Sequence, residues 1–171
     1  RWYSPSAPEH EYSRVIVNPI EFYPRPQPSE QVSQDRLREL SRYMTQRLED
    51  EVRQYYTVVT RPGPNTFSLH FAITGVETPI EGLKAYNAIP VSAIVAGVSA
   101  VSGERDHIPV LYIEGKAIDS ITHEVLAKGV RQGVGNSLKD DSEQLEVEDL
   151  KELINGWARE IATLSRRLQP K

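Results

Sequence analysis

The residues best suited to chemistry are four histidines, and none stands at the spacing that a metal-binding helix requires. They are His10, His70, His107 and His123. The zinc-binding helix of metalloproteases carries a His-Glu-x-x-His motif, and the chain has none. Residues 104–107, Glu-Arg-Asp-His, do place carboxylates beside an imidazole, which are groups that a metal site or a hydrolase uses. The pattern favours a solvated loop for this cluster.

Neither paired carboxylates nor nucleophiles form a recognisable catalytic set. Acidic pairs occur at Glu49/Glu51, among arginines on a predicted helix, and at Asp140/Asp141, in a polar segment. General acid–base catalysis needs a carboxyl group in a cleft with a shifted pKa, so both pairs indicate solvated surface. The chain has no Gly-x-Ser-x-Gly motif, and residues 129–137 lack the Gly-Lys-[Ser/Thr] ending of a phosphate loop. We expect no catalytic residue, no metal and no cofactor.

Composition narrows the function classes further. The chain has 171 residues, 20 Lys and Arg against 24 Asp and Glu, a net charge of −4 and no cysteine. This length predicts one domain. The mildly acidic balance gives no electrostatic reason to bind nucleic acid or an anionic membrane surface. The absence of cysteine excludes disulfides, cysteine-ligated zinc and thiol catalysis within these residues.

Two long amphipathic helices are predicted, and each has a single apolar stripe. The first runs from about residue 30 to 56, and the second begins near residue 147. The first stripe comprises Leu37, Leu40, Met44, Leu48, Val52 and Tyr55. The second comprises Leu150, Ile154, Trp157, Ile161, Leu164 and Leu168. Two such stripes favour helices that cover one face of a sheet.

Strands are predicted at 12–18, 56–60 and 67–74, and in a hairpin of 107–119 with 124–131. The clearest is 67–74, where apolar and polar residues alternate. Residues 75–88 are interpreted as a loop. Proline is concentrated in the first 28 residues, so 1–11 is interpreted as an extended tail or linker, and 12–171 as a single domain.

A short helix rich in small residues is predicted at 89–103. Its apolar face comprises Val91, Ile94, Val98 and Val101, and we interpret it as packing on the sheet or as an interaction helix. The predicted fold class is therefore α/β (α+β). It has a mixed sheet of about five strands, two long amphipathic helices and one short small-residue helix.

Several segments resemble a family of bacterial lipoproteins defined only as a domain of unknown function. They include Val17-Asn18-Pro19-Ile20-Glu21-Phe22, the Pro-Gly-Pro turn at 62–64 with the strand after it, Trp157-Ala158, and the hairpin segment 118–126. The family is similar in organisation to the amino-terminal domain of TolB. It usually has glycine at the position of His123, where glycine would take a positive φ that histidine tolerates less well.

The resemblance implies a periplasmic domain tethered to a membrane through a lipidated cysteine upstream of Arg1. The chain opens on Arg-Trp-Tyr without a signal-peptide pattern, so we expect a processed form. The leading hypothesis is a non-enzymatic envelope domain whose partners are other envelope proteins or a second copy. The alternative is a binding module for a small glycan or lipid, favoured by a deep apolar pocket lined by Tyr86, Tyr112 or Phe71. The third hypothesis is a hydrolase that uses residues 104–107.

Overall fold

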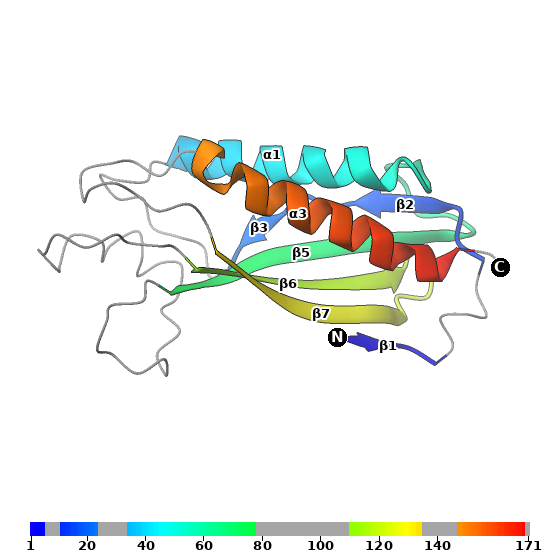
Figure 1. Ribbon diagram of the computed structural model, residues 1–171. Helices are drawn as coiled ribbons and strands as arrows, with labels where there is room; N and C mark the ends of the chain where they lie inside the picture. Colours follow the sequence, from blue (N-terminus) through cyan, green and yellow to red (C-terminus); the bar gives the residue numbers. More distant parts are fainter. Residues whose placement is uncertain (6–10, 24–33, 78–109, 135–146, 170–171) are drawn as a thin grey trace, which may run out of the picture.

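The chain folds into one layer of sheet and one layer of helices (Figure 1). The computed structural model describes residues 1–5, 11–23, 34–77, 110–134 and 147–169. Both long helices lie on the same face of the sheet, so their apolar stripes and the apolar side of the sheet form one core. This arrangement confirms the predicted mixed α and β class.

In the described part of the chain the sheet is mixed and has seven strands. They are β1 (Trp2–Tyr3), β2 (Arg14–Val17), β3 (Glu21–Phe22), β4 (Thr57–Val58), β5 (Thr66–Glu77), β6 (Val110–Asp119) and β7 (Val125–Val134). The order is β1-β7-β6-β5-β2-β4, with β3 also paired to β5. The pairings of β2 and β3 are parallel, and the run β5-β6-β7-β1 is antiparallel.

The helices are α1 (Gln34–Val52) and α3 (Val147–Ser165), the latter followed by the 3-10 turn η3 (Arg166–Leu168). The buried residues of α1 are Leu37, Leu40, Met44, Leu48 and Val52, which is the predicted stripe. In α3 the stripe is buried at Leu150, Ile154 and Trp157 but only half-buried at Ile161 and Leu164. The half-buried end of this stripe lies over an apolar cavity between α3 and the sheet.

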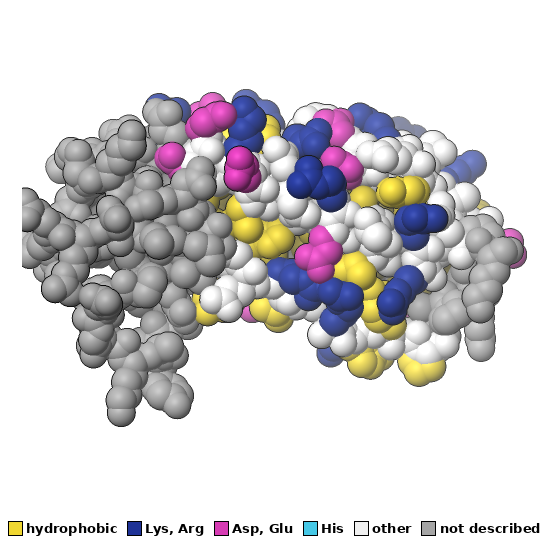
Figure 2. Space-filling model, viewed as in Figure 1, with side chains coloured by type: hydrophobic (Ala, Val, Ile, Leu, Met, Phe, Trp, Pro, Cys, Tyr) yellow, Lys and Arg dark blue, Asp and Glu magenta, His cyan; other side chains and the backbone are white. Residues whose placement is uncertain are grey.

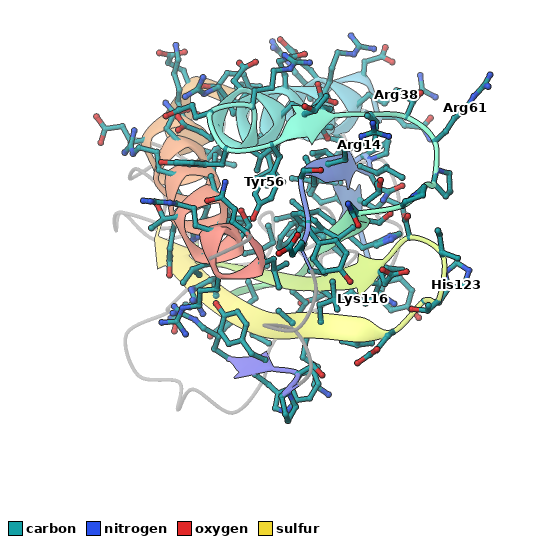
Figure 3. The ribbon with its side chains drawn as sticks, turned by 90° about the vertical axis from the view of Figure 1, so that its right-hand side faces the viewer. Arg14, Arg38, Tyr56, Arg61, Lys116 and His123 are labelled. Atoms are coloured by element: carbon teal, nitrogen blue, oxygen red, sulfur yellow. The ribbon has the colours of Figure 1, made fainter. Side chains whose placement is uncertain are left out.

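Polar contacts fix the two helices and the sheet relative to one another. Asn155 on α3 accepts hydrogen bonds from Tyr43 Oη, at 3.1 Å, and from Arg47 Nε, at 2.8 Å, both on α1. Tyr56 lies between the helices and the strands in Figure 3, where its hydroxyl donates to the backbone carbonyl of Ser165. The Tyr56 ring also packs edge-on against Phe67, with the ring centres 5.0 Å apart.

Several predicted boundaries were wrong. The first helix ends at Val52 rather than near residue 56, because Tyr56 turns inward to reach α3 and β5. Residues 75–77 belong to β5 rather than to a loop, since a bulge between Ile73 and Gly75 lets the pairing with β6 continue. The predicted strand count misses β1 and β3, two-residue strands too short to show alternation.

The N-terminal segment differs from a free tail. Trp2 and Tyr3 pair with Lys128 and Ala127 at the outer edge of β7, and the backbone N–H of Ser4 donates to the carbonyl of Leu126 at 2.8 Å. The first residues are thus part of the sheet. The predicted small-residue helix at 89–103 lies outside the described residues.

Candidate functional site

The residues proposed for a site from the sequence fall into two groups. Val91, Ile94, Val98 and Val101, the cluster at 104–107 and Tyr86 all lie outside the described residues. The carboxylates of Glu49 and Glu51 lie on α1 in ion pairs, with Arg53 at 3.1 Å and Arg47 at 2.9 Å. Such paired surface carboxylates are structural, which agrees with the sequence interpretation.

A row of polar side chains crosses the sheet face that points away from the helices. Trp2 stands opposite Lys128, Lys128 opposite Lys116, and Lys116 opposite His70. Side chains that stand opposite one another share a face, so these four form one continuous row, here called the transverse row. Figure 3 shows Lys116 on the side of the sheet away from α1 and α3.

The transverse row carries an unfavourable charge pair. Lys116 and Lys128 are directly opposite, and like charges in that position destabilise a sheet. The Lys128 ammonium lies 5.5 Å from the centre of the Trp2 ring, which gives it a cation–π contact. Among the described residues, the Lys116 side chain has no ion-pair or hydrogen-bond partner. The row thus offers a positive charge to whatever meets this face.

His70 ends the row, where its surroundings favour the neutral imidazole. Its Nε2 lies 3.4 Å from the Asn18 side-chain amide, which also donates to the backbone carbonyl of Leu69 at 3.0 Å. Burial lowers the pKa of His70 below its usual value, and the nearby Lys116 charge lowers it further, against a smaller opposing effect of Glu21. A neutral imidazole in this setting is a hydrogen-bonding group rather than a cation.

Apolar side chains are exposed within the transverse row and beside it. Trp2 is 43% exposed and Val130 is 53% exposed. A hollow of about 790 Å³ extends over the same face and includes Asn18, His70 and Lys116 in its lining. Exposed apolar groups next to an open hollow are typical of an interaction surface.

An apolar cavity of about 90 Å³ lies on the other face of the sheet, beneath the C-terminal half of α3. It is lined by Phe71, Gly115, Gly129, Ile161, Leu164 and Leu168, among others. Of the three pocket residues expected for small-ligand binding, Phe71 lines this cavity and Tyr112 does not, while Tyr86 lies outside the described residues. The half-buried Ile161 and Leu164 are therefore explained by a cavity below them.

Charged groups frame the mouth of this cavity. One carboxylate oxygen of Glu160 on α3 receives both Arg1 Nη2, at 3.0 Å, and Arg131 Nε, at 2.8 Å. The guanidinium of Arg167 lies 5.0 Å from the centre of the Tyr3 ring. Figure 2 shows hydrophobic surface below α3, bordered by dark blue basic side chains and a magenta acidic one. The frame therefore has an excess of positive charge.

The turn between β6 and β7 has a structural role. Asp119 accepts hydrogen bonds from the backbone N–H groups of Ile121, at 2.8 Å, and Thr122, at 2.7 Å, and from the Tyr12 hydroxyl at 2.9 Å. Burial alone would raise the pKa of Asp119, but these bonds outweigh burial and lower it. His123, labelled in Figure 3, has φ of 61°, the conformation expected of the family's glycine.

Sequence reasoning missed the residues of this edge. The sequence places Trp2 in a tail and both lysines in a hairpin, and it offers Gly129 and Val130 only as hairpin residues and as the start of a rejected phosphate-loop candidate. The alternation in the two hairpin strands places both lysines on the polar face. Their opposition depends on a register shift next to Ala117, which the sequence does not signal.

Comparison with known proteins identifies the family. A family model described as a protein of unknown function, DUF3313, matches residues 1–161. The chain belongs to the DUF3313 family. It is 37% identical over 158 residues to the uncharacterized lipoprotein YdcL of Escherichia coli K12, an alignment that covers 92% of this chain and 71% of YdcL. The predicted resemblance to an uncharacterised bacterial lipoprotein family is confirmed.

Solved structures share the fold of this DUF3313 chain. The hypothetical protein CT253 of Chlamydia trachomatis has a TM-score of 0.54 at 11% identity, over 92% of this chain and 98% of that one. Protein XCC0632 of Xanthomonas campestris has a TM-score of 0.53 at 12% identity, over 95% of this chain and 88% of that one. At these identities the likeness concerns the fold alone. Among the described residues, no helix is both long and apolar enough to cross a membrane.

Proposed function

We propose that the chain is a non-enzymatic periplasmic domain of an envelope lipoprotein and that it works through protein contacts. The observation that carries the proposal is the open sheet face, where Trp2 and Val130 are exposed beside two opposed lysines. Opposed like charges and exposed apolar groups reduce the stability of the isolated domain. A protein partner that covers this face would relieve both effects.

The partner is another envelope protein or a second copy of the chain. We propose that a lipid on a cysteine upstream of Arg1 holds the domain at a membrane, in keeping with the lipoprotein relative. Since β1 lies beside β7, such a tether would enter the domain at the edge of the open face (Figure 1). Membrane contact then requires no membrane-binding surface on the domain itself, and nucleic acid is not an expected partner.

The proposal is tested with the complete protein extracted from envelopes of the bacterium that makes it. Light scattering and crosslinking should show a species larger than the protomer. A double variant, Trp2→Ser with Val130→Lys, should lose that species because it removes the exposed apolar groups. The matched control is Glu39→Lys, on the outer face of α1, which should keep it. A persistently monomeric wild type that captures no partner would contradict the proposal.

A second candidate function, the binding of a small glycan or lipid, is favoured by the cavity beside Phe71. Small-molecule sites usually occupy roughly 300–1,000 Å³, and this cavity has about 90 Å³. Its size therefore suits part of a ligand rather than a whole one. The hydrolase hypothesis depends on residues 104–107, which the structure does not describe; His107→Ala in any assay that shows turnover would test it.

A further inference from the structure

Gly129 is a glycine that core packing does not explain. Three glycines face the helices from the hairpin strands: Gly115, Gly129 and Gly133. A Cβ at Gly115 would lie 2.0 Å from the Phe71 ring, and one at Gly133 would lie 2.2 Å from Leu153, so both positions are already filled. A Cβ at Gly129 would meet only Arg1, at 3.7 Å or more, which is ordinary contact.

The missing side chain of Gly129 therefore helps to leave the cavity open. Glycine inside a strand costs stability, because it adds backbone freedom to the unfolded chain and contributes no packing. An apolar cavity costs further stability through lost contacts. Glycine in a strand often marks a place where a ligand or another backbone comes close. Gly129 thus leaves space for an apolar group beneath α3.

The volume of the cavity limits which side chain can fit into it. An apolar cavity of about 150 Å³ holds a benzene ring. The cavity under α3 has about 90 Å³, which suits a branched aliphatic side chain such as leucine. A few side chains buried in pockets commonly supply most of the affinity of an interface.

The charges at the mouth of the cavity favour acidic residues near the bound aliphatic side chain. Arg1 and Arg131 share one oxygen of Glu160, so two guanidinium groups face a single carboxylate. A second carboxylate supplied by a partner would complete the pairing, because arginine has several donors to offer. Basic residues flanking the aliphatic side chain would instead be repelled.

The backbone beside the cavity can pair with an added strand. On its outer side, within the described residues, β7 pairs with β1 at Ala127 and Lys128 and not beyond. The backbone of β7 from Val130 to Val134 is therefore an open edge next to Arg1. Extended peptides commonly bind by adding a strand to such an edge.

We propose that the cavity under α3 receives one aliphatic side chain from an extended acidic segment of a partner protein, which pairs with the outer edge of β7. This inference rests on the proposed function and assigns a binding site to it. Side chains two positions apart in a strand share a face, so the aliphatic residue points under α3 while acidic residues two positions before and after it meet Arg1 and Arg131.

The probe is a short acetylated peptide of sequence Asp-Thr-Leu-Thr-Asp, titrated at millimolar concentrations into the 15N-labelled chain. Saturable shifts of the amide signals of Ala127, Gly129 and Leu164 are expected. The matched peptide with lysine in place of both aspartates should bind at least about tenfold more weakly, because it repels the arginine frame.

The decisive variant is Gly129→Val, which places a branched side chain at the cavity. It should weaken peptide binding about tenfold while its melting temperature stays equal to that of the wild type or rises. If the valine variant does not fold, Gly129→Ala gives the same test, because its Cβ would make only ordinary contacts. The expected loss of peptide binding is then smaller. Glu160→Gln should strengthen binding, since it leaves both arginines available.

Three results would overturn the inference: no saturable shift at the cavity, equal binding of the two peptides, or unchanged binding by Gly129→Val. Sodium decanoate is titrated in parallel. If it shifts the cavity signals and the acidic peptide does not, the site takes an aliphatic lipid and the protein-segment assignment is wrong. Partner complexes in the envelope extract, together with no peptide-induced shift of the amide signals at the cavity, would leave the proposed function in place and contradict only this site.

Discussion

The carboxylate of Asp119 joins two parts of the chain that are far apart in sequence. It ties the turn after β6 to Tyr12, a buried residue that precedes β2 and also packs edge-on against Phe67, with the ring centres 5.6 Å apart. It accepts hydrogen bonds from two backbone N–H groups of the turn, which would have no partner there without this side chain. A single side chain thus holds the turn in place against the core.

Asp119→Ala should lower the free energy of unfolding by about 1–3 kcal/mol, because hydrogen bonds to a charged group are lost at a partly buried site. Tyr12→Phe removes one donor to this carboxylate and should cost about 1 kcal/mol. Urea denaturation measures both, and the double variant should lose less than the sum of the two, since the groups contact one another. Strictly additive losses would show that they act independently.

His123 occupies a conformation that favours glycine. Its φ of 61° brings the Cβ close to the backbone, which costs a side chain about 1–2 kcal/mol. His123→Gly should therefore raise the free energy of unfolding by up to about 1 kcal/mol, after allowing for the greater freedom of glycine in the unfolded chain. His123→Ala keeps the Cβ and should bring no such gain. A gain of equal size in both variants would contradict the backbone explanation.

His70 should make stability depend on pH. Its pKa in the folded chain is below the unfolded value, so the unfolded state binds a proton more readily. The contribution to stability is present above an unfolded pKa of about 6.5 and is lost as the pH falls toward the lower folded pKa. Urea denaturation between pH 7.5 and 5 should show a steeper loss for the wild type than for His70→Gln. Parallel curves would contradict this assignment.

At the scale of whole elements, the glycines show how closely α3 packs against the sheet. Gly133 of β7 lies against Leu153 and Trp157, where a Cβ would be 2.2 Å and 2.6 Å from their side-chain atoms. Such close approach of a helix to a strand requires the small residue. Gly156, one residue before Trp157 on the same helix, has open space around it.

Gly133→Ala should cost about 1–3 kcal/mol through displacement of α3. Gly156→Ala should instead gain about 1 kcal/mol, because alanine favours a helix interior and meets nothing within 4 Å. Thermal melting of the pair separates helix packing from helix propensity. If both variants shift the melting temperature in the same direction, α3 is not seated on Gly133 as described.

The sequence predicts helices and strands correctly where an apolar pattern repeats over many residues. It fails where tertiary contacts decide which residues form a strand. The stripe of α1 from Leu37 to Val52 and the alternation from Phe67 to Ile73 contain enough repeats to define a helix and a strand. The pairing of Trp2–Tyr3 with β7 involves two residues and leaves no pattern. The same limit hid the candidate site, since the opposition of Lys116 and Lys128 and the space beside Gly129 exist only after the hairpin has formed.

Considered as a whole molecule, the domain has one helix-covered face and one face that no described element covers (Figure 1). The covered face explains the buried core and holds the small cavity at its β7 end. The uncovered face carries the transverse row and Val130. Both features meet at the edge formed by β7 and β1. We therefore place the contact with a partner at this edge.

The most direct test of that placement is site-specific photo-crosslinking of the complete protein in its own bacterium. A photoreactive amino acid is introduced in place of Val130 on the open face, or in place of Glu39 on the outer face of α1 as the control. The account predicts a discrete protein adduct, with another envelope protein or a second copy, from position 130 and none from position 39. No adduct from position 130, or the same adduct from both positions, would contradict it.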